Sequence, residues 1–332
     1  MFGLDKILNG GKLHDTNGLT ILAGNSNPEL VKEIADLLGK APGDVLAGRF
    51  PEGEIQVQIR ENIRGRDVFI LQSICTSPND YLMELLILID AARRASAKRI
   101  TAVLPFFGYA RQDRKDRPRV PITAKLVANL ITTAGAHRVL TMDLHAGQIQ
   151  GFFDIPVDHL YSINMLGDHM RRKNLQNVVV VSTDVGGIRM ARAYASFLNS
   201  SFAILDKRRE SATQTHVMNI IGDVKGKNVM IVDDMVSTGG SLVEAVHTLK
   251  EAGALEVYAV IVHPILAGNA AEKIRDSELS ELIVTNSIPL APESRIQKIK
   301  QVSVAPLLAD AMLRIHRNES VSSLFSQVRV EA

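Results

Sequence analysis

Short apolar runs rich in Val and Ile recur along the whole chain, and amphipathic segments of helix length separate several of them. The runs cover residues 19–23, 68–71, 100–104, 138–144, 178–181, 229–232 and 257–262. Each is typical of a strand buried on both faces of a sheet. Apolar residues spaced three and four apart predict helices over 29–38, 81–97, 122–133 and 242–251. This alternation predicts an α/β fold with mainly parallel sheets.

Helix-end signals and chain length extend this prediction to two domains. Asn27-Pro28 precedes the first predicted helix, and Gly135 and Gly253 follow two others, as capping preferences require. A chain of 332 residues is longer than one hydrophobic core usually supports. The alternation runs through two comparable halves that join near residues 156–161, and a last amphipathic helix is predicted over 304–316.

Composition excludes several classes of function. The chain has 38 basic and 36 acidic residues, so its net charge of +2 creates no global field toward nucleic acid or an anionic membrane. Cys75 is the single cysteine, which excludes an internal disulfide. The first fifteen residues lack the apolar run of a signal peptide, and the apolar stretch 82–89 is too short to span a bilayer. We therefore expect a cytoplasmic protein without a membrane segment or a nucleic-acid partner.

The segment 228–241 carries the strongest local signal for a binding site. An apolar strand is followed by Asp233 and Asp234, then by a loop of small residues that leads into a predicted helix. The loop consists of Ser237, Thr238, Gly239, Gly240 and Ser241. Such a loop offers free backbone N–H groups and hydroxyl donors to a phosphate, and its glycines allow close approach. An ionised Asp233 would accept from the hydroxyls of a ribose, while alternation along the strand predicts a different role for Asp234.

This segment resembles the phosphoribosyl-pyrophosphate motif shared by type I phosphoribosyltransferases and ribose-phosphate pyrophosphokinases. The long stretches 104–130 and 141–154 resemble the pyrophosphokinase family specifically. The resemblance implies two tandem phosphoribosyltransferase-like domains, 17–158 and 159–318, with the last helix packing on the N-terminal one. It also implies transfer of the β,γ-diphosphoryl group of Mg-ATP to the C1 hydroxyl of ribose 5-phosphate, giving 5-phosphoribosyl 1-diphosphate and AMP for nucleotide biosynthesis. No G-x-x-x-x-G-K-[ST] sequence is present, so ATP is not held by a Walker-type loop.

The ATP site is implied by the resemblance more than by the residues alone. The loop 111–119 carries enough positive charge to face a triphosphate, although such a run is also typical of a solvated surface. The turn 50–54 by itself indicates only a surface turn before a strand. The resemblance assigns ATP contacts to Phe50, Glu52, Gly53, Glu54, Arg111 and Gln112. Phe50 would stack on adenine and the two glutamates would accept from its donors, across a subunit contact of a homohexamer.

Acidic residues and one histidine are candidates for holding Mg²⁺. Asp143 and His145 stand two residues apart at the end of a predicted strand, which places their side chains on one face. Mg²⁺ prefers oxygen ligands, so the imidazole would act through water or phosphate. The resemblance places Mg²⁺ at His145 and Asp184, with Asp143, Asp154 and Asp158 ranked below them.

The segment 206–210 is expected to begin a mobile loop, because the polar stretch 211–216 that follows has little to anchor it. The resemblance assigns the catalytic role there to Lys207 and Arg209, with Arg209 also contacting ribose 5-phosphate. Ser237 and the stretch 210–216 depart from the usual pattern of the family.

Two other functions remain open at this stage. A phosphoribosyltransferase would use the same phosphate loop, but it would not need the stretches around Arg111 and His145. A non-enzymatic subunit of a synthetase assembly would keep the fold, but the presence of Lys207, Arg209, His145 and Asp233 favours an enzyme.

Overall fold

The computed structural model describes residues 16–184, 186–208 and 217–324. It divides into two compact units. Among the described residues, unit 1 comprises 16–161, 287–289 and 303–324, and unit 2 comprises the remainder.

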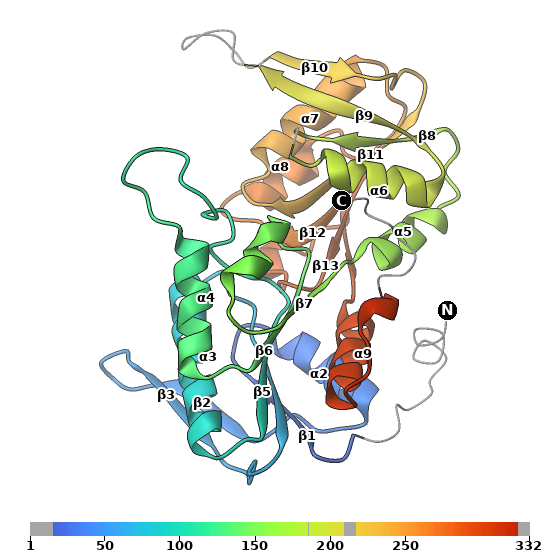
Figure 1. The fold of residues 1–332 in the computed structure, drawn as a ribbon. Coiled ribbons are helices and arrows are strands. Elements are labelled where there is room, and N and C mark those ends of the chain that lie inside the picture. Colours follow the sequence, from blue (N-terminus) through green and yellow to red (C-terminus); the bar gives the residue numbers. More distant parts are fainter. Residues whose placement is uncertain (1–15, 185, 209–216, 325–332) are drawn as a thin grey trace. The chain divides into compact units, whose positions relative to one another are not determined.

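Unit 1 is built on a five-stranded sheet in which every pair of neighbours is parallel (Figure 1). In spatial order its strands are β1 (Leu19–Ala23), β4 (Asp67–Leu71), β5 (Arg99–Leu104), β6 (Arg138–Met142) and β7 (Val157–Leu160). The strand order follows the chain order, so the chain advances across this sheet in one direction. The antiparallel hairpin β2 (Val45–Arg49) and β3 (Ile55–Ile59) forms a separate two-stranded sheet.

Helices cover both faces of this sheet. They are α2 (Pro28–Leu38), α3 (Pro78–Arg94), α4 (Thr123–Ala134) and α9 (Ala305–His316), with 3-10 turns η1 (Gly147–Phe152) and η3 (Ser322–Leu324). α3 packs against α4 and α2 packs against α9, and Figure 1 shows the two pairs on opposite sides of the sheet. The predicted caps are confirmed, because the Asn27 side chain accepts from the Leu30 N–H and Gly135 ends α4 in the left-handed region.

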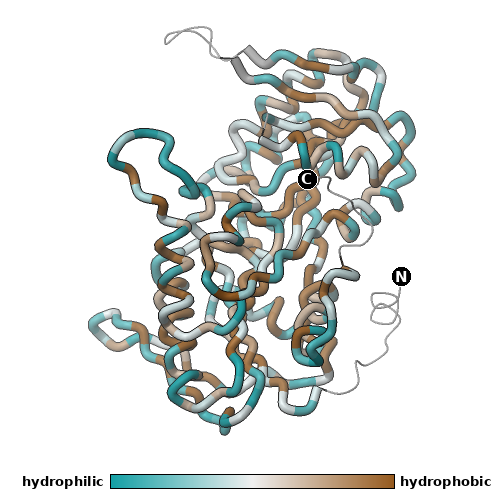
Figure 2. Tube along the Cα trace, viewed as in Figure 1, coloured by the Kyte–Doolittle hydropathy of each residue, from teal (hydrophilic) through white to brown (hydrophobic). Residues whose placement is uncertain are grey.

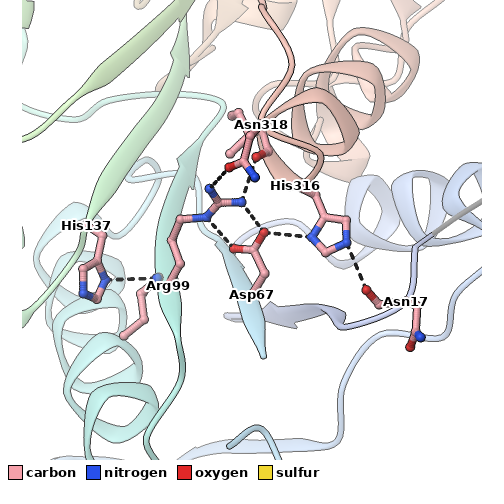
Figure 3. A network of polar contacts seen from close by, with 8 residues as sticks. Asn17, Asp67, Arg99, His137, His316 and Asn318 are labelled. Atoms are coloured by element: carbon pink, nitrogen blue, oxygen red, sulfur yellow. Dashed lines mark hydrogen bonds and ion pairs between the residues drawn. The ribbon is translucent and has the colours of Figure 1, made fainter. Parts of the chain in front are cut away.

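A polar network attaches the end of α9 to the amino ends of β4 and β5 (Figure 3). Arg99 Nε donates to Asp67 Oδ1 at 2.8 Å, and a second guanidinium nitrogen pairs with the other carboxylate oxygen. His316 Nδ1 lies 2.8 Å from Asp67 Oδ2, and its Nε2 lies 3.0 Å from the carbonyl oxygen of Asn17. Arg99 also donates to the carbonyl oxygen of Ile315 at 2.7 Å. The C-terminal helix is therefore held to the sheet of unit 1 by an ion pair whose carboxylate is buried.

Unit 2 contains a seven-stranded sheet whose strand order reverses in the middle. The spatial order is β10 (Val217–Ile221), β9 (Ser201–Arg208), β8 (Val178–Ser182), β11 (Asn228–Val236), β12 (Val257–Pro264), β13 (Glu281–Thr285) and β14 (Ile299–Val302). Within the described part of this sheet, β9 and β10 form an antiparallel pair and the other neighbours are parallel. The chain moves outward from β8 on one side and from β11 on the other, so the order reverses between these two central strands.

The helices of unit 2 follow from this reversal. They are α5 (Ile163–Arg171), α6 (Ile188–Leu198), α7 (Gly240–Glu251) and α8 (Ala270–Asp276), with one 3-10 turn, η2 (Pro292–Ser294). Right-handed crossovers that lead in opposite directions place α6 and α7 on opposite faces of the sheet. α6 packs with α5, whereas α7 packs with α8, and both of the latter helices contribute residues to a buried hydrophobic cluster of this unit.

The predicted α/β fold with mainly parallel sheets is confirmed, and all seven predicted strands are present. β6 ends two residues earlier than predicted, at Met142, because Asp143 has a positive φ of 40° and leaves the extended conformation. β11 runs further than predicted and includes both Asp233 and Asp234. The strand predicted to follow the turn 50–54 is present as β3. The strands β2, β7, β10, β13 and β14 and the helices α5, α6 and α8 were not predicted.

Hydropathy follows the same architecture. Figure 2 shows apolar residues along the strands of each sheet and a largely hydrophilic loop between β5 and α4. Across the described residues, none of the helices combines the length and apolar character needed to cross a bilayer.

Candidate active site

The carboxyl ends of β8 and β11 bring two polar side chains together at the reversal point of unit 2. Ser182 pairs with Val232 in the parallel register, so Thr183 and Asp233 come next on neighbouring strands. Thr183 Oγ1 donates to Asp233 Oδ2 at 2.9 Å, and the backbone N–H of Asp234 donates to Asp233 Oδ1 at 2.8 Å. Ligands of open α/β sheets bind at such a reversal of strand order, outside the carboxyl ends. The sequence motif around Asp233 therefore lies where this topology favours a ligand.

Asp233 has an unusual ionisation. Burial, followed by the charge and hydrogen bond of the Asp234 carboxyl group, raises the pKa of Asp233 to about 7. The hydrogen bonds from Thr183 and from the Asp234 N–H oppose this rise. Strand alternation predicts opposite faces for the two aspartates, yet their carboxyl groups interact. A carboxyl group that titrates near neutral pH and lies at a site edge is typical of a functional position.

The loop 237–241 joins β11 to α7 and is suited to an anion. Gly239 is the N-cap of α7 and has a positive φ of 73°, a conformation that glycine adopts without strain. Among the residues that the structure describes, no side chain caps this end of the helix. Thr238, Gly240 and Ser241 are exposed. The first N–H groups of α7 are thus available to a phosphate, which the helix dipole also favours.

Lys273 adds a positive charge that the sequence analysis missed. Its Nζ donates to the carbonyl oxygen of Thr238 at 3.3 Å, from helix α8. A lysine in a short amphipathic helix gives no sequence signal of its own, and only the packing of α8 against α7 places it beside the loop.

Asp184 lies in the loop that follows β8, at the same sheet edge as Asp233. Its Oδ1 accepts from the N–H of Gly187 at 2.8 Å, and Ser182 Oγ donates to its carbonyl oxygen at 2.7 Å. A Cβ atom on Gly187 would lie 2.5 Å from Ser182 Oγ, so this tight turn requires glycine there. The Asp184 side chain remains exposed and its carboxylate faces solvent.

The other predicted metal residues are more dispersed. His145 is exposed in the loop between β6 and η1, whereas Asp143 is buried. The expectation that these two share a strand face is wrong, because the strand ends before both. Asp154 lies 3.9 Å from Lys125 Nζ, and Asp158 accepts from Arg138 at 2.6 Å.

Within residues 16–184, 186–208 and 217–324, no three His, Cys, Asp or Glu side chains gather to form a metal cage. Mg²⁺ commonly binds through one or two carboxylates together with substrate phosphates and water. The exposed carboxylate of Asp184, at the same sheet edge as Asp233, is of the kind that could serve in this way. Asp158, already neutralised by an arginine, suits this role less well.

The predicted ATP residues occupy two loops of unit 1. Residues 50–54 form the turn of the β2–β3 hairpin, closed by the Phe50 N–H donating to the Glu54 carbonyl at 2.8 Å. Gly53 has a positive φ of 98°. The Phe50 side chain is 42% exposed, so its ring is accessible to a stacking partner. Glu52 and Glu54 are also exposed.

Arg111 and Gln112 lie in the long loop between β5 and α4, and both are exposed. The side-chain oxygen of Gln112 accepts from the Thr123 hydroxyl, and its carbonyl oxygen accepts from the Ala124 N–H at 3.2 Å. Both partners lie in the first turn of α4, so Gln112 is fixed to that helix.

The predicted catalytic loop falls partly outside the described residues. Lys207 belongs to β9, where its backbone pairs with Met218 of β10. Arg209 and the stretch 210–216 lie outside the described residues, so the predictions of a catalytic arginine and of a mobile loop there stay predictions.

Comparison with known proteins identifies the family. Residues 19–135 match the N-terminal domain of ribose phosphate pyrophosphokinase, and residues 209–326 match the phosphoribosyl synthetase-associated domain. The ribose-phosphate pyrophosphokinase of Chlorobaculum tepidum is 56% identical over 94% of this chain and 96% of its own length. That of Bacillus subtilis is 53% identical over 93% of this chain and 97% of its own length.

A solved structure supports the same family assignment. The phosphoribosylpyrophosphate synthetase of Mycobacterium smegmatis is 42% identical, with a TM-score of 0.86, over 90% of this chain and 99% of that chain. With mainly parallel sheets and relatives above half identity over nearly full length, this chain belongs to the ribose-phosphate pyrophosphokinases, a family of diphosphoryl transferases.

Proposed function

We propose that this chain transfers the β,γ-diphosphoryl group of Mg-ATP to the C1 hydroxyl of ribose 5-phosphate, releasing AMP. One observation carries the assignment of the ribose 5-phosphate site. Asp233, at the reversal point of the unit 2 sheet, is followed within a few residues by a helix N-terminus that no described side chain caps. A hydroxyl acceptor next to an anion site matches the two ends of a sugar phosphate.

The roles within this site follow from chemistry. The 5-phosphate binds the N–H groups and hydroxyls of the loop 237–241, with Lys273 adding positive charge. Asp233 in its ionised form accepts from the ribose hydroxyls, which are donors. Asp234 supports it through its backbone N–H, which fixes one oxygen of Asp233. The C1 hydroxyl then attacks the β-phosphorus of ATP, the bond between that phosphorus and the α-phosphate oxygen breaks, and AMP leaves.

We assign nucleotide binding to residues of unit 1. We assign stabilisation of the transferring phosphates to cationic residues. Phe50 provides a stacking surface for adenine, Glu52 and Glu54 provide acceptors, and Gly53 gives the turn its shape. Arg111 and Gln112 contact the nucleotide from their loop. Lys207 and Arg209 are assigned to the transferring phosphates, where positive charge stabilises the transition state. A homo-oligomer, a hexamer as in the family resemblance, is part of the same proposal.

Asp184 is the carboxylate best suited to hold Mg²⁺, and His145 is assigned to the metal as well. Mg²⁺, when bound, neutralises the charge that develops on the phosphate oxygens. Asp143, Asp154 and Asp158 rank below, since Asp154 and Asp158 already face cations of their own.

The test is AMP formation by the purified full-length chain, with each reactant omitted in turn. We expect AMP to appear only when ATP, ribose 5-phosphate and Mg²⁺ are all present. AMP formation without ribose 5-phosphate would contradict the proposal, as would silence in the complete mixture. Release of diphosphate from 5-phosphoribosyl 1-diphosphate on addition of a nucleobase, with no AMP from ATP, would select the phosphoribosyltransferase alternative.

A further inference from the structure

The geometry points to Thr183 as a positioning residue that holds the carboxylate of Asp233 in the orientation that receives ribose 5-phosphate. This inference rests on the proposed ribose 5-phosphate site. Thr183 is the first residue after β8, and its hydroxyl donates to Asp233 Oδ2 at 2.9 Å across fifty residues of sequence. This donor lies outside the motif 228–241.

The hydrogen bonds of Asp233 explain why a second anchor matters. The Asp234 N–H fixes Oδ1, but the terminal torsion of an aspartate is broad, so one anchored oxygen leaves the carboxylate plane free to turn. The Thr183 hydroxyl fixes the second oxygen. A carboxylate has about four acceptor positions, so the bonds from Thr183 and the Asp234 N–H do not use all of them. With both oxygens anchored, the remaining positions keep one direction before the substrate arrives.

The hydroxyl of Thr183 is not needed to hold the strands together. β8 and β11 are already paired along their whole common length, from Val178 with Asn228 to Ser182 with Val232. Thr183 is only half-buried, so in the absence of Asp233 its hydroxyl could still hydrogen-bond to water. The register places Thr183 directly beside Asp233, and strand alternation directs both side chains to the same face. The contact is therefore best explained by its effect on Asp233.

Preorganisation of this kind lowers the cost of binding, because the acceptor does not have to be ordered when the sugar arrives. Loss of the Thr183 hydrogen bond should weaken the binding of ribose 5-phosphate and leave the binding of ATP unchanged. A residue that only stabilised the fold would lower the apparent kcat, through the fraction of folded enzyme, and would leave the KM for both substrates unchanged.

The test compares Thr183→Val with Thr183→Ser in the full-length chain. Valine keeps the branched shape and removes the donor, whereas serine keeps the donor. For Thr183→Val we expect the KM for ribose 5-phosphate to rise about tenfold, with the KM for ATP unchanged, as for a lost hydrogen bond to a charged group. Thr183→Ser should restore the ribose 5-phosphate KM to within about twofold of wild type. Thermal unfolding of both variants is measured in parallel.

Three results would overturn the inference. One is a wild-type ribose 5-phosphate KM in Thr183→Val. Another is a lower apparent kcat with both KM values unchanged, accompanied by a lower unfolding temperature. The third is a serine variant as impaired as the valine variant.

Asp233→Asn separates this inference from the proposed site. If Asp233→Asn leaves the ribose 5-phosphate KM unchanged, the site itself is wrongly assigned. If Asp233→Asn raises that KM and Thr183→Val does not, only the role of Thr183 is wrong. In the double variant, Thr183→Val should add little to the effect of Asp233→Asn, because the carboxylate that it positions is gone.

Discussion

The raised pKa of Asp233 gives ribose 5-phosphate binding a pH dependence that an ordinary aspartate would not produce. With a pKa of about 7, Asp233 is mostly protonated at pH 6 and mostly ionised at pH 8. The ionised form accepts from the sugar hydroxyls, so affinity should increase as pH rises through 7. We expect the dissociation constant, measured by calorimetry, to fall about tenfold from pH 6 to pH 8.

The phosphate of the ligand titrates near pH 6 as well, so the comparison needs Asp233→Asn as its control. Any change due to the phosphate is common to both proteins, and the ratio of their dissociation constants isolates Asp233. That ratio should change with pH. A constant ratio between pH 6 and pH 8 would mean that Asp233 does not titrate in this range or does not contact the sugar.

At the scale of secondary-structure elements, the attachment of α9 to β4 and β5 offers a stability prediction. Asp67 is 7% exposed and receives Arg99 and His316 together. Asp67→Asn keeps the shape but leaves a partly buried guanidinium without its counter-charge. We expect the free energy of unfolding to fall by about 3 kcal/mol. Because the chain has no Trp, far-ultraviolet circular dichroism in urea is the suitable measurement.

Asp90→Asn is a matched control for this variant. Asp90 also accepts from an arginine Nε, that of Arg94 at 2.7 Å, but both side chains are exposed. Exposed pairs contribute little, so the free energy of unfolding of this variant should fall much less than that of Asp67→Asn. Equal losses of unfolding free energy in the two variants would show that the burial of Asp67 does not increase the contribution of its ion pair to stability.

The helices and strands differ in how clearly their local sequences predict them. Strands such as β4, in which the buried residues 68–71 form an unbroken apolar run, were predicted. β3 alternates Ile and Val with Gln because its residues are only partly buried, and β7 carries Asp and His. Neither segment forms an unbroken apolar run. The helices α5 and α8 are too short to show a clear helical periodicity of apolar residues. Local sequence therefore marks the central strands better than the peripheral elements.

At the scale of the whole molecule, strand order explains what the sequence could not give for the site. The motif at Asp233 and the loop 237–241 follow directly from chain order, so they were predicted. The donation from Thr183 and the proximity of Lys273 depend on which strands and helices become neighbours. Among the strands that the structure describes, the order reverses in the seven-stranded sheet of unit 2, and the position of this reversal between β8 and β11 is set by tertiary structure. The near-neutral net charge leaves anion binding to such local arrangements.

The central claim is that the two terminal phosphates of ATP move together to C1 of ribose 5-phosphate. Phosphorus NMR of a reaction of the full-length chain with ATP, ribose 5-phosphate and Mg²⁺ tests it directly, because each product has its own resonances. We expect AMP and 5-phosphoribosyl 1-diphosphate in equal amounts. ADP with a ribose 1,5-bisphosphate would show transfer of a single phosphoryl group, and that result would contradict the claim.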